Sequence, residues 1–384
     1  MKSTKRRIVI AVFLTVLLCC TWFCAACRPS GVWLGFISES YFHTNATLRL
    51  YAEREEDVVS AEQLTESVRN TLKHVEEKIG ISVACSDVNR FNEAETGERI
   101  EICETAYRVF SEARRIYEWT DGAYNPAVYY SVLEYGFYFS DRNKPPTLPD
   151  LERIDAFRRL SEHFSDIVLE CEDGKFYVTK PQDAFITIGE ERLTLKVDLG
   201  GIGKGYAADC VSKLIEEAGF SYGYFNFSAS SMSLKKYLPD REQFVLSVAD
   251  PREEGEYISI GVCDTALSTS GDNGLYFERD GVRYSQIINP ESGMPVNVSS
   301  DGKQTDGIIS ATVLGGSAAE CDALTTALMA MGREKAVGFM RTHLSERKVF
   351  FVYRSNDSEF EVVTNVSESE FRLLKSGYHL TVIQ

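Results

Sequence analysis

Apolar positions recur along the chain with two different spacings, which predict helices in some segments and strands in others. Between Ala61 and Ile79 apolar residues recur at helical spacing, so this segment predicts an amphipathic helix. A second helix is predicted from Ile102 to Tyr117. Apolar and polar side chains alternate from Thr47 to Ala52, as they do in a half-buried strand. Such segments follow one another irregularly to the C-terminus, which favours an α+β architecture over a regular doubly wound sheet.

The N-terminal residues have the pattern of an export signal. Four cations precede an uncharged apolar run from Ile8 to Ala26, which is about long enough to cross a bilayer. Two alanines precede Cys27, which resembles a bacterial lipoprotein cleavage site; an uncleaved membrane anchor and plain secretion are the alternatives. We therefore expect a signal or anchor over residues 1–27, a spacer over 28–43 and one domain over 44–384. All three alternatives place that domain outside the cytoplasm, and the first two hold it at the cell membrane.

The charge balance narrows the range of ligands. The chain has 41 Lys+Arg against 57 Asp+Glu, a formal net charge of -16. This charge argues against a nucleic-acid binder, because neutralising phosphates requires a basic face. An anionic ligand is still compatible with it if a metal ion or backbone dipoles hold that ligand locally. The six cysteines that follow the N-terminal segment form no CxxC or Cys/His pair with metal-ligand spacing, so their pattern predicts no zinc site.

The clearest local signal is a glycine-rich turn in the segment TLKVDLGGIGKGYAAD, residues 194–209. Apolar side chains alternate up to Leu199, four glycines follow within six residues, and a helical stripe then runs to Gly219. A strand that leads through glycines into a helix directs backbone N–H groups at an anion, and Lys204 could reach the same anion. Asp198 is suited to accept a hydrogen bond from a base or a ribose hydroxyl. The segment fits neither GxxxxGK[ST] nor GxGxxG, so a turn without a ligand is the alternative.

A second candidate site lies on the helix predicted from Ser317 to Met331. Asp322 and Thr326 are four residues apart and share one helix face, and Thr325 is close to it. One carboxylate with hydroxyl oxygens is a hard donor set that suits Mg²⁺, which takes few protein ligands. The structural alternative is an aspartate near a helix start, with threonines that bond to the preceding turn.

Taken in order, the segments VDLGGIGKGYAAD, STSGD, QIINPESGMP and CDALTTALMAMG resemble the FAD:protein FMN transferase (ApbE-type) family, with GAYNPAV and SDVNRFN upstream. The resemblance implies an α+β fold of mixed sheets and packed helices, with the ligand site between two lobes. It also implies that Mg²⁺ binds the diphosphate of FAD, that a Ser or Thr hydroxyl of an exported target attacks the FMN-side phosphorus, and that AMP leaves. Such targets carry a D-G-x-x-S/T-A-T-like site. The implied metal ligands are the carbonyl of Gly201, Asp322 and Thr325 or Thr326, and the implied FAD contacts are Asn45, Ser82, Ala123, Tyr124, Asn125, Asp198, Lys204 and Ile288.

The departures from the family pattern lie on the flavin and acceptor side. Gln286 stands where the family has a histidine, and glutamine cannot take up a proton at neutral pH. Ser228–Ala229–Ser230 replaces Gly-Gly-Asn, and its side chains could narrow a close backbone approach. Asn45 and Ser82 replace a methionine and an aromatic residue. The expected function is therefore a Mg²⁺-dependent transferase; the alternative is a surface lipoprotein that binds or hydrolyses FAD without transfer.

Overall fold

The computed structural model describes residues 31–138, 148–228, 230–356 and 359–383. The signal or anchor expected over residues 1–27 lies outside this part of the chain. Within it, none of the helices is both long enough and apolar enough to cross a membrane.

A nine-stranded sheet forms the centre of the molecule, in the order β1-β2-β8-β9-β12-β15-β16-β17-β19. Neighbouring strands are antiparallel except for β17 and β19, which are parallel. Every residue of β15 is buried, as expected for a central strand covered on both faces. The strands are β1 (Val32–Tyr41), β2 (Thr44–Ala52), β8 (Gly223–Phe227), β9 (Ser231–Leu234), β12 (Thr265–Gly271), β15 (Ile308–Leu314), β16 (Lys348–Asn356), β17 (Glu359–Thr364) and β19 (Tyr378–Val382).

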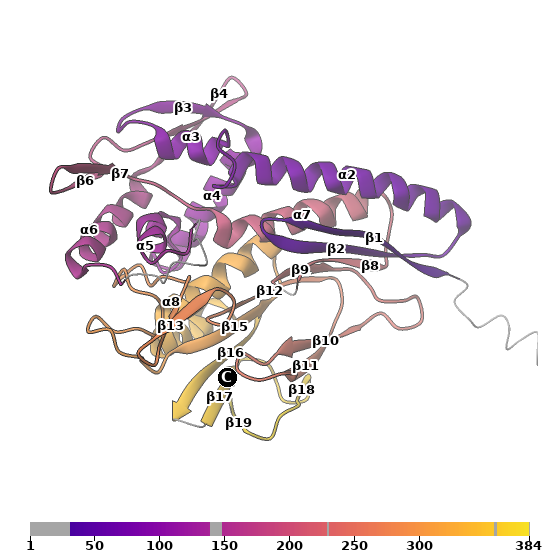
Figure 1. The fold of residues 1–384 in the computed structure, drawn as a ribbon. Helices are drawn as coiled ribbons and strands as arrows, with labels where there is room; N and C mark the ends of the chain where they lie inside the picture. Colours follow the sequence, from indigo (N-terminus) through magenta and orange to yellow (C-terminus); the bar gives the residue numbers. More distant parts are fainter. Residues whose placement is uncertain (1–30, 139–147, 229, 357–358, 384) are drawn as a thin grey trace, which may run out of the picture.

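Helices cover the sheet and build a helical part beside it. Figure 1 shows α2 and α7 side by side over the β1–β2–β8 end of the sheet. α8 follows β15 along the chain and packs against β12, β15 and α7. The helices are α2 (Glu55–Ile79), α3 (Asp87–Glu93), α4 (Glu104–Trp119), α5 (Tyr129–Glu134), α6 (Leu151–Ser161), α7 (Gly200–Glu217) and α8 (Ala318–His343), with 3₁₀ turns η1 (Pro126–Val128) and η2 (Glu162–Asp166).

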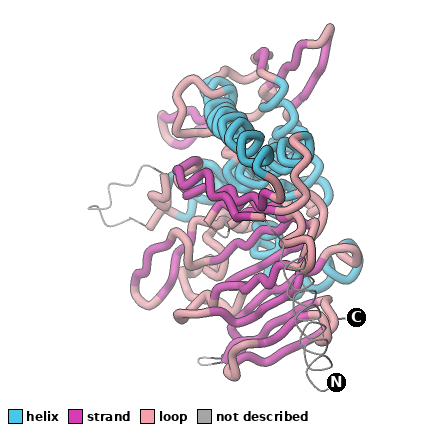
Figure 2. Tube along the Cα trace, turned by 90° about the vertical axis from the view of Figure 1, so that its right-hand side faces the viewer, coloured by secondary structure: helices cyan, strands magenta, loops and turns pink. Residues whose placement is uncertain are grey.

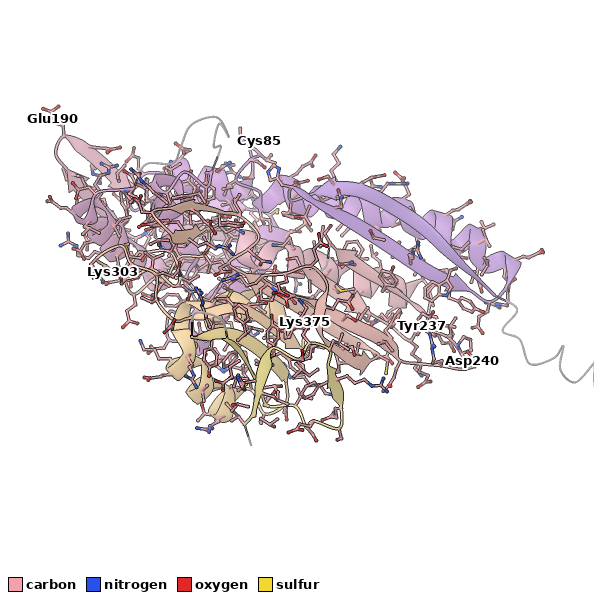
Figure 3. All side chains as sticks on the ribbon, turned by 60° about the horizontal axis from the view of Figure 1, so that its bottom comes forward. Cys85, Glu190, Tyr237, Asp240, Lys303 and Lys375 are labelled. Atoms are coloured by element: carbon pink, nitrogen blue, oxygen red, sulfur yellow. The ribbon has the colours of Figure 1, made fainter. Side chains whose placement is uncertain are left out.

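Four smaller sheets of the described residues flank this centre. In Figure 2 most helices gather in the upper part of the molecule, and most strands are stacked below them. Figure 3 shows Glu190, between β6 and β7, and Asp240, before β10, at opposite ends of the molecule. The smaller sheets are β10 (Phe244–Ala249) with β11 (Glu256–Val262) and β18 (Phe371–Leu373); β3 (Arg99–Ile102) with β5 (Lys175–Thr179) and β4 (Val168–Glu172); β6 (Phe185–Ile188) with β7 (Glu191–Thr194); and β13 (Tyr276–Arg279) with β14 (Val282–Ser285).

The predicted helices are present, and the α+β class is confirmed. The helix expected over 102–117 is α4, displaced by two residues at each end. The helix expected from Ala61 begins earlier, at Glu55. The Asp57 carboxylate accepts a hydrogen bond from the backbone N–H of Arg54 at 2.9 Å, so the polar first turn is stabilised without an apolar stripe.

Two segments differ from their predicted form. Residues 32–41, expected in the spacer, form β1 and pair along β2 with one irregularity between Gly35 and Ile37. The strand expected before the glycine turn, residues 195–199, belongs to no sheet. Its backbone N–H groups bond to separate acceptors and not to a neighbouring strand. Leu195 N–H donates to Ala184 O, and Val197 N–H donates to the Asn92 side chain. The alternating burial that suggested a strand therefore arises from an extended segment held by side chains and loops.

Candidate functional site

A cavity of about 1140 Å³ lies where the glycine turn, the sheet and α8 meet. Its volume exceeds that of a typical pocket for one drug-sized ligand, so a dinucleotide would fit. One side is formed by Ser82, residues 123–126 and the first turn of α7. Residues of β12, β15 and α8 form the other side. The site therefore lies between the helical part of the molecule and the central sheet.

Asp198 is fixed directly before α7. Its backbone N–H donates to Pro126 O at 2.9 Å, and its Oδ1 accepts from Gly200 N–H at 2.8 Å. Its Oδ2 accepts from the Tyr138 hydroxyl at 2.6 Å. Burial, together with the Asp198 carboxylate, raises the pKa of Tyr138 well above its usual value, so the phenol keeps its proton and donates. The pair presents a carboxylate and an oriented phenol to the cavity.

Asp322, on α8, is the buried carboxylate of the site, with 3% of its surface exposed. Its Oδ2 accepts from Gly205 N–H at 3.1 Å, and its Oδ1 accepts from the Ser268 hydroxyl at 3.0 Å. Lys204 Nζ lies 3.8 Å from Oδ2. Two carboxylate oxygens offer about four acceptor positions, so these two hydrogen bonds leave the carboxylate free to bind a further cation.

A second carboxylate joins the middle of α7 to the first turn of α8 and places Asp322 against the glycine turn. Asp209 on α7 accepts from Ala318 N–H at 2.7 Å and from Ala319 N–H at 2.9 Å. A Cβ added to Gly205 would lie 2.2 Å from Ala318 O, so the helices approach where there is no side chain. Burial raises the pKa of Asp209 to about 6, although its backbone hydrogen bonds act in the opposite direction.

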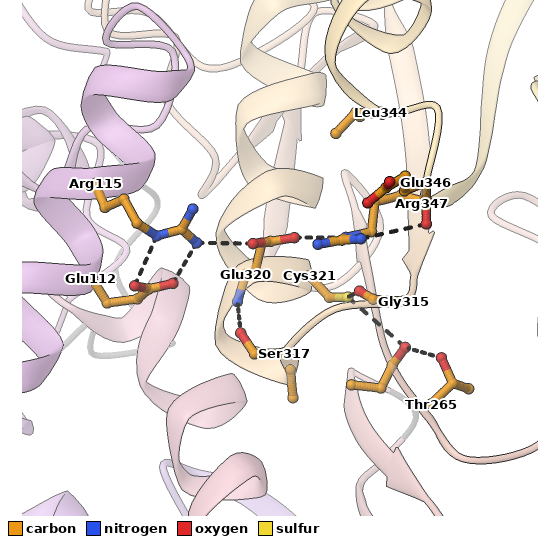
Figure 4. Close-up of polar contacts among 12 residues, drawn as sticks. Glu112, Arg115, Thr265, Gly315, Ser317, Glu320, Cys321, Leu344, Glu346 and Arg347 are labelled. Carbon is orange, nitrogen blue, oxygen red and sulfur yellow. Dashed lines mark hydrogen bonds and ion pairs between the residues drawn. The ribbon is translucent and has the colours of Figure 1, made fainter.

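The start of α8 is also held from its sides by an ion-pair network around the buried Glu320 (Figure 4). The Glu320 carboxylate, with a side chain 9% exposed, accepts from Arg115 at 2.9 Å and from Arg347 at 2.7 Å. Arg115 also pairs with Glu112 on its own helix at 2.7 Å. Because Glu320 is two residues before Asp322, this network fixes the turn that carries the metal-binding candidate.

The two candidate threonines have different environments. Thr325 is fully buried, does not line the cavity, and shares a hydrogen bond of 2.8 Å with Ser270. Thr326 lines the cavity, and its Oγ1 lies 3.8 Å from the position of a Cβ on Gly201. That Cβ would also be 3.3 Å from the Tyr124 ring, so a side chain here would fit only tightly.

The Asp322 carboxylate, the Thr326 hydroxyl and the Gly201 carbonyl are oxygen ligands of the kind that Mg²⁺ binds. The Tyr124 hydroxyl is buried beside the turn, without a hydrogen-bond partner among the described groups, so a polar ligand would satisfy it. Nowhere in the described ranges do three His, Cys, Asp or Glu side chains converge as a metal cluster. A site of Asp322, Thr326 and the Gly201 carbonyl thus has one charged ligand, which suits an ion that keeps water and phosphate oxygens in its shell.

Most of the residues predicted to contact FAD line the same cavity. They are Ser82, Ala123, Tyr124, Asn125, Asp198, Lys204 and Ile288. Asn45 does not line it; its carbonyl accepts a hydrogen bond from the Ser228 hydroxyl at 3.1 Å. Gln286 and Ser228 line the cavity with exposed side chains, and Ser230 lines it with a half-buried one.

Sequence reasoning missed three residues of the site. Tyr138 follows α5 in a segment without a motif, so nothing in the sequence indicated its bond to Asp198. Ser268 belongs to the polar segment STSGD, which marked the region without indicating which hydroxyl meets Asp322. Asp209 ends the glycine-turn segment, and its spacing from Lys204 gave no sign of a bond to another helix.

The cavity brings Asp198, Lys204 and Asp322 together at the N-terminal part of α7, and comparison with known proteins gives the family of the chain. The model of the ApbE family matches residues 42–351, and the chain belongs to this family. The FAD:protein FMN transferase of Vibrio cholerae is 28% identical over 306 residues, 78% of this chain and 82% of that protein. The Escherichia coli K12 protein of the same name is 25% identical over 305 residues, 79% of this chain and 80% of its own length.

Solved structures show the same fold. The flavin transferase ApbE from Vibrio cholerae has a TM-score of 0.69 at 23% identity, covering 89% of this chain and 100% of its own. The ApbE protein from Thermotoga maritima also has a TM-score of 0.69, at 22% identity, covering 84% of this chain and 94% of its own.

Proposed function

We propose that the chain is a Mg²⁺-dependent FAD:protein FMN transferase that attaches FMN through a phosphoester to a Ser or Thr of exported proteins and releases AMP. Membership of the ApbE family and the names of its relatives support flavin transfer. The observation that carries the proposal is the convergence of Asp322, Thr326 and Gly201 at the glycine turn within one cavity.

Different residues at the glycine turn would bind the metal ion and the phosphates. Asp322, Thr326 and the Gly201 carbonyl would hold Mg²⁺, and the first N–H groups of α7 and Lys204 would bind phosphate oxygens. When bound, Mg²⁺ supplies the positive charge that an acidic protein needs around a diphosphate under attack. Asp198, oriented by Tyr138, would accept a hydrogen bond from FAD.

The reaction replaces one phosphorus–oxygen bond by another. The acceptor hydroxyl oxygen bonds to the FMN-side phosphorus, the bond from that phosphorus to the bridging oxygen breaks, and AMP leaves with this oxygen. The hydroxyl proton passes to water. Because Asp322, Lys204 and the α7 N-terminus converge on one place, they position the diphosphate for this in-line exchange.

The cellular location belongs to the same proposal. The apolar run from Ile8 to Ala26 and the following Cys27 support export and attachment to the outer face of the cell membrane, through a lipid or the uncleaved segment. The acceptors would then be exported proteins with a D-G-x-x-S/T-A-T-like site. Radiolabelled palmitate incorporated by wild-type cells but not by cells with Cys27→Ala would identify the lipid-anchored form.

The transferase proposal is tested with the detergent-solubilised full chain, FAD, Mg²⁺ and an Asp-Gly-x-x-Ser-Ala-Thr peptide. We expect an FMN mass adduct on the peptide and one AMP for each adduct. Asp322→Ala should lose both products, whereas Asp173→Asn, at an exposed turn residue, should retain them. If no adduct forms at any Mg²⁺ concentration, the transferase proposal is wrong.

A second function, FAD binding or hydrolysis without transfer, is favoured by Gln286. Its amide lines the cavity but cannot accept the hydroxyl proton. This alternative predicts retained FAD with no peptide adduct, and either no AMP or AMP in the absence of peptide. A rise in peptide modification in Gln286→His would show that this position limits transfer.

A further inference from the structure

An exposed apolar corner lies at the margin of the cavity, where the loop after β12 enters the β13–β14 hairpin. We use "apolar corner" for Leu275 and Tyr276, each 42% exposed. Eleven large apolar side chains of the described residues are exposed, and among these Leu275 alone lines the cavity. Tyr276 follows it and lies outside the lining. The corner therefore extends from the cavity to the outer surface.

The hairpin that carries the corner is fixed from its inner face. Phe277 stacks on Tyr284 with ring centroids 5.0 Å apart and an interplanar angle of 9°. Phe277 also lies 5.7 Å from Phe137, and Tyr284 lies 6.1 Å from Tyr135. Since successive strand residues point to opposite faces, this packing turns Tyr276 to the outer face.

The outer face is also ordered before any ligand arrives. The Arg283 guanidinium carbon lies 4.1 Å from the centre of the Tyr276 ring, and Arg283 pairs with Glu278 at 2.8 Å. Arg283 is also 3.8 Å from the buried carboxylate of Asp272, the first residue of the loop after β12. The backbone N–H of Gln286 donates to Leu275 O at 3.0 Å and closes the corner against the cavity. A rigid apolar surface loses little conformational entropy when it binds a partner.

We propose that the apolar corner is the docking surface for the acceptor polypeptide and binds an apolar side chain next to its reactive Ser or Thr. This inference rests on the proposed transferase function. Leu275 lines the cavity and Tyr276 lies outside the lining, so a ligand that contacts both extends from the cavity to the outer surface. The polypeptide is the substrate of that size, and an extended segment would place its hydroxyl inward while the neighbouring side chain packs on the corner.

The test compares two peptides, Asp-Gly-Ala-Leu-Ser-Ala-Thr and Asp-Gly-Ala-Asn-Ser-Ala-Thr, which differ by a near-isosteric change beside the serine. Modification is measured with the full chain and the variants Leu275→Ser and Tyr276→Ser. The matched control is Leu374→Ser, whose leucine is 47% exposed and does not line the cavity. KM for peptide, kcat and KM for FAD are determined for each pair.

We expect the wild type and Leu374→Ser to favour the leucine peptide by at least about fivefold in KM, as burial of part of one apolar side chain gives. Each corner variant should lose most of this preference, and Tyr276→Ser, whose tyrosine lies outside the cavity lining, should leave KM for FAD unchanged. An unchanged peptide preference in both corner variants, or a change confined to KM for FAD, overturns the inference and leaves the transferase function standing. If the wild type modifies neither peptide, both proposals are wrong.

Discussion

Replacing Asp209 by asparagine tests how deeply the contact between α7 and α8 is buried. This contact, called the joint below, is formed by the Asp209 carboxylate and the backbone of Ala318 and Ala319. The native carboxylate accepts two backbone N–H groups of α8, at 2.7 and 2.9 Å. Asparagine keeps the shape but has one accepting oxygen, so one buried N–H loses its partner at a cost of about 1–3 kcal/mol. At neutral pH this loss is offset, because the variant no longer buries a charge.

The magnitude follows from the raised pKa. The pKa of Asp209 lies at about 6 in the folded chain against 3.8 for the ordinary side chain, which corresponds to about 3 kcal/mol. The folded state holds this proton more tightly, so unfolding releases it as pH rises from about 4 to 6. The Asp209 contribution to the free energy of unfolding is therefore highest near pH 4, falls by about 3 kcal/mol by pH 6 and is constant above.

The assay is urea unfolding of wild type and Asp209→Asn at several pH values between 4 and 7. The difference in free energy of unfolding, wild type minus variant, should fall by about 3 kcal/mol across this range. Asp173→Asn, at an exposed turn residue, should give a flat difference. A flat difference for Asp209→Asn as well would refute the reasoning. Mg²⁺ affinity, measured by calorimetry, should decrease in Asp209→Asn, because the joint places Asp322 against the glycine turn.

Three further changes test separate parts of the structure. Gly205→Ala would bring a Cβ to 2.2 Å from Ala318 O, so urea unfolding should show a loss of about 1–3 kcal/mol. Tyr138→Phe removes the hydrogen bond to Asp198 and should raise the Kd for FAD about tenfold in a fluorescence titration; an unchanged Kd would remove the pair from the FAD site. Burial lowers the pKa of Lys180 to about 8. Between pH 8 and 10.5 the lysine is neutral in the folded chain and protonated in the unfolded chain, so wild-type stability should rise with pH. Thermal unfolding should show this rise in the wild type and not in Lys180→Met.

Much of the local structure could be predicted because it depends on near neighbours. Helical spacing identified α2 and α4, and the helix predicted from Ser317 to Met331 forms the first part of α8, which is kinked at Gly332, where φ is 68°, and continues to His343. The four glycines predicted as a turn before a helix lie instead within the first two turns of α7, which begins at Gly200. The segment 195–199 was predicted as a strand because alternating burial has the same pattern in a sheet and in an extended chain held by side chains.

The sequence by itself determined which residues share a helix face and where the chain turns, since a helix repeats every 3.6 residues and glycine relieves crowding locally. It did not determine which threonine faces the cavity, because Thr325 and Thr326 are neighbours and the packing of α8 decides between them. The bond from Gly205 to Asp322 spans 117 residues of chain. The tertiary structure alone brings these residues together, since contacts over such a separation depend on how α7, β12 and α8 pack.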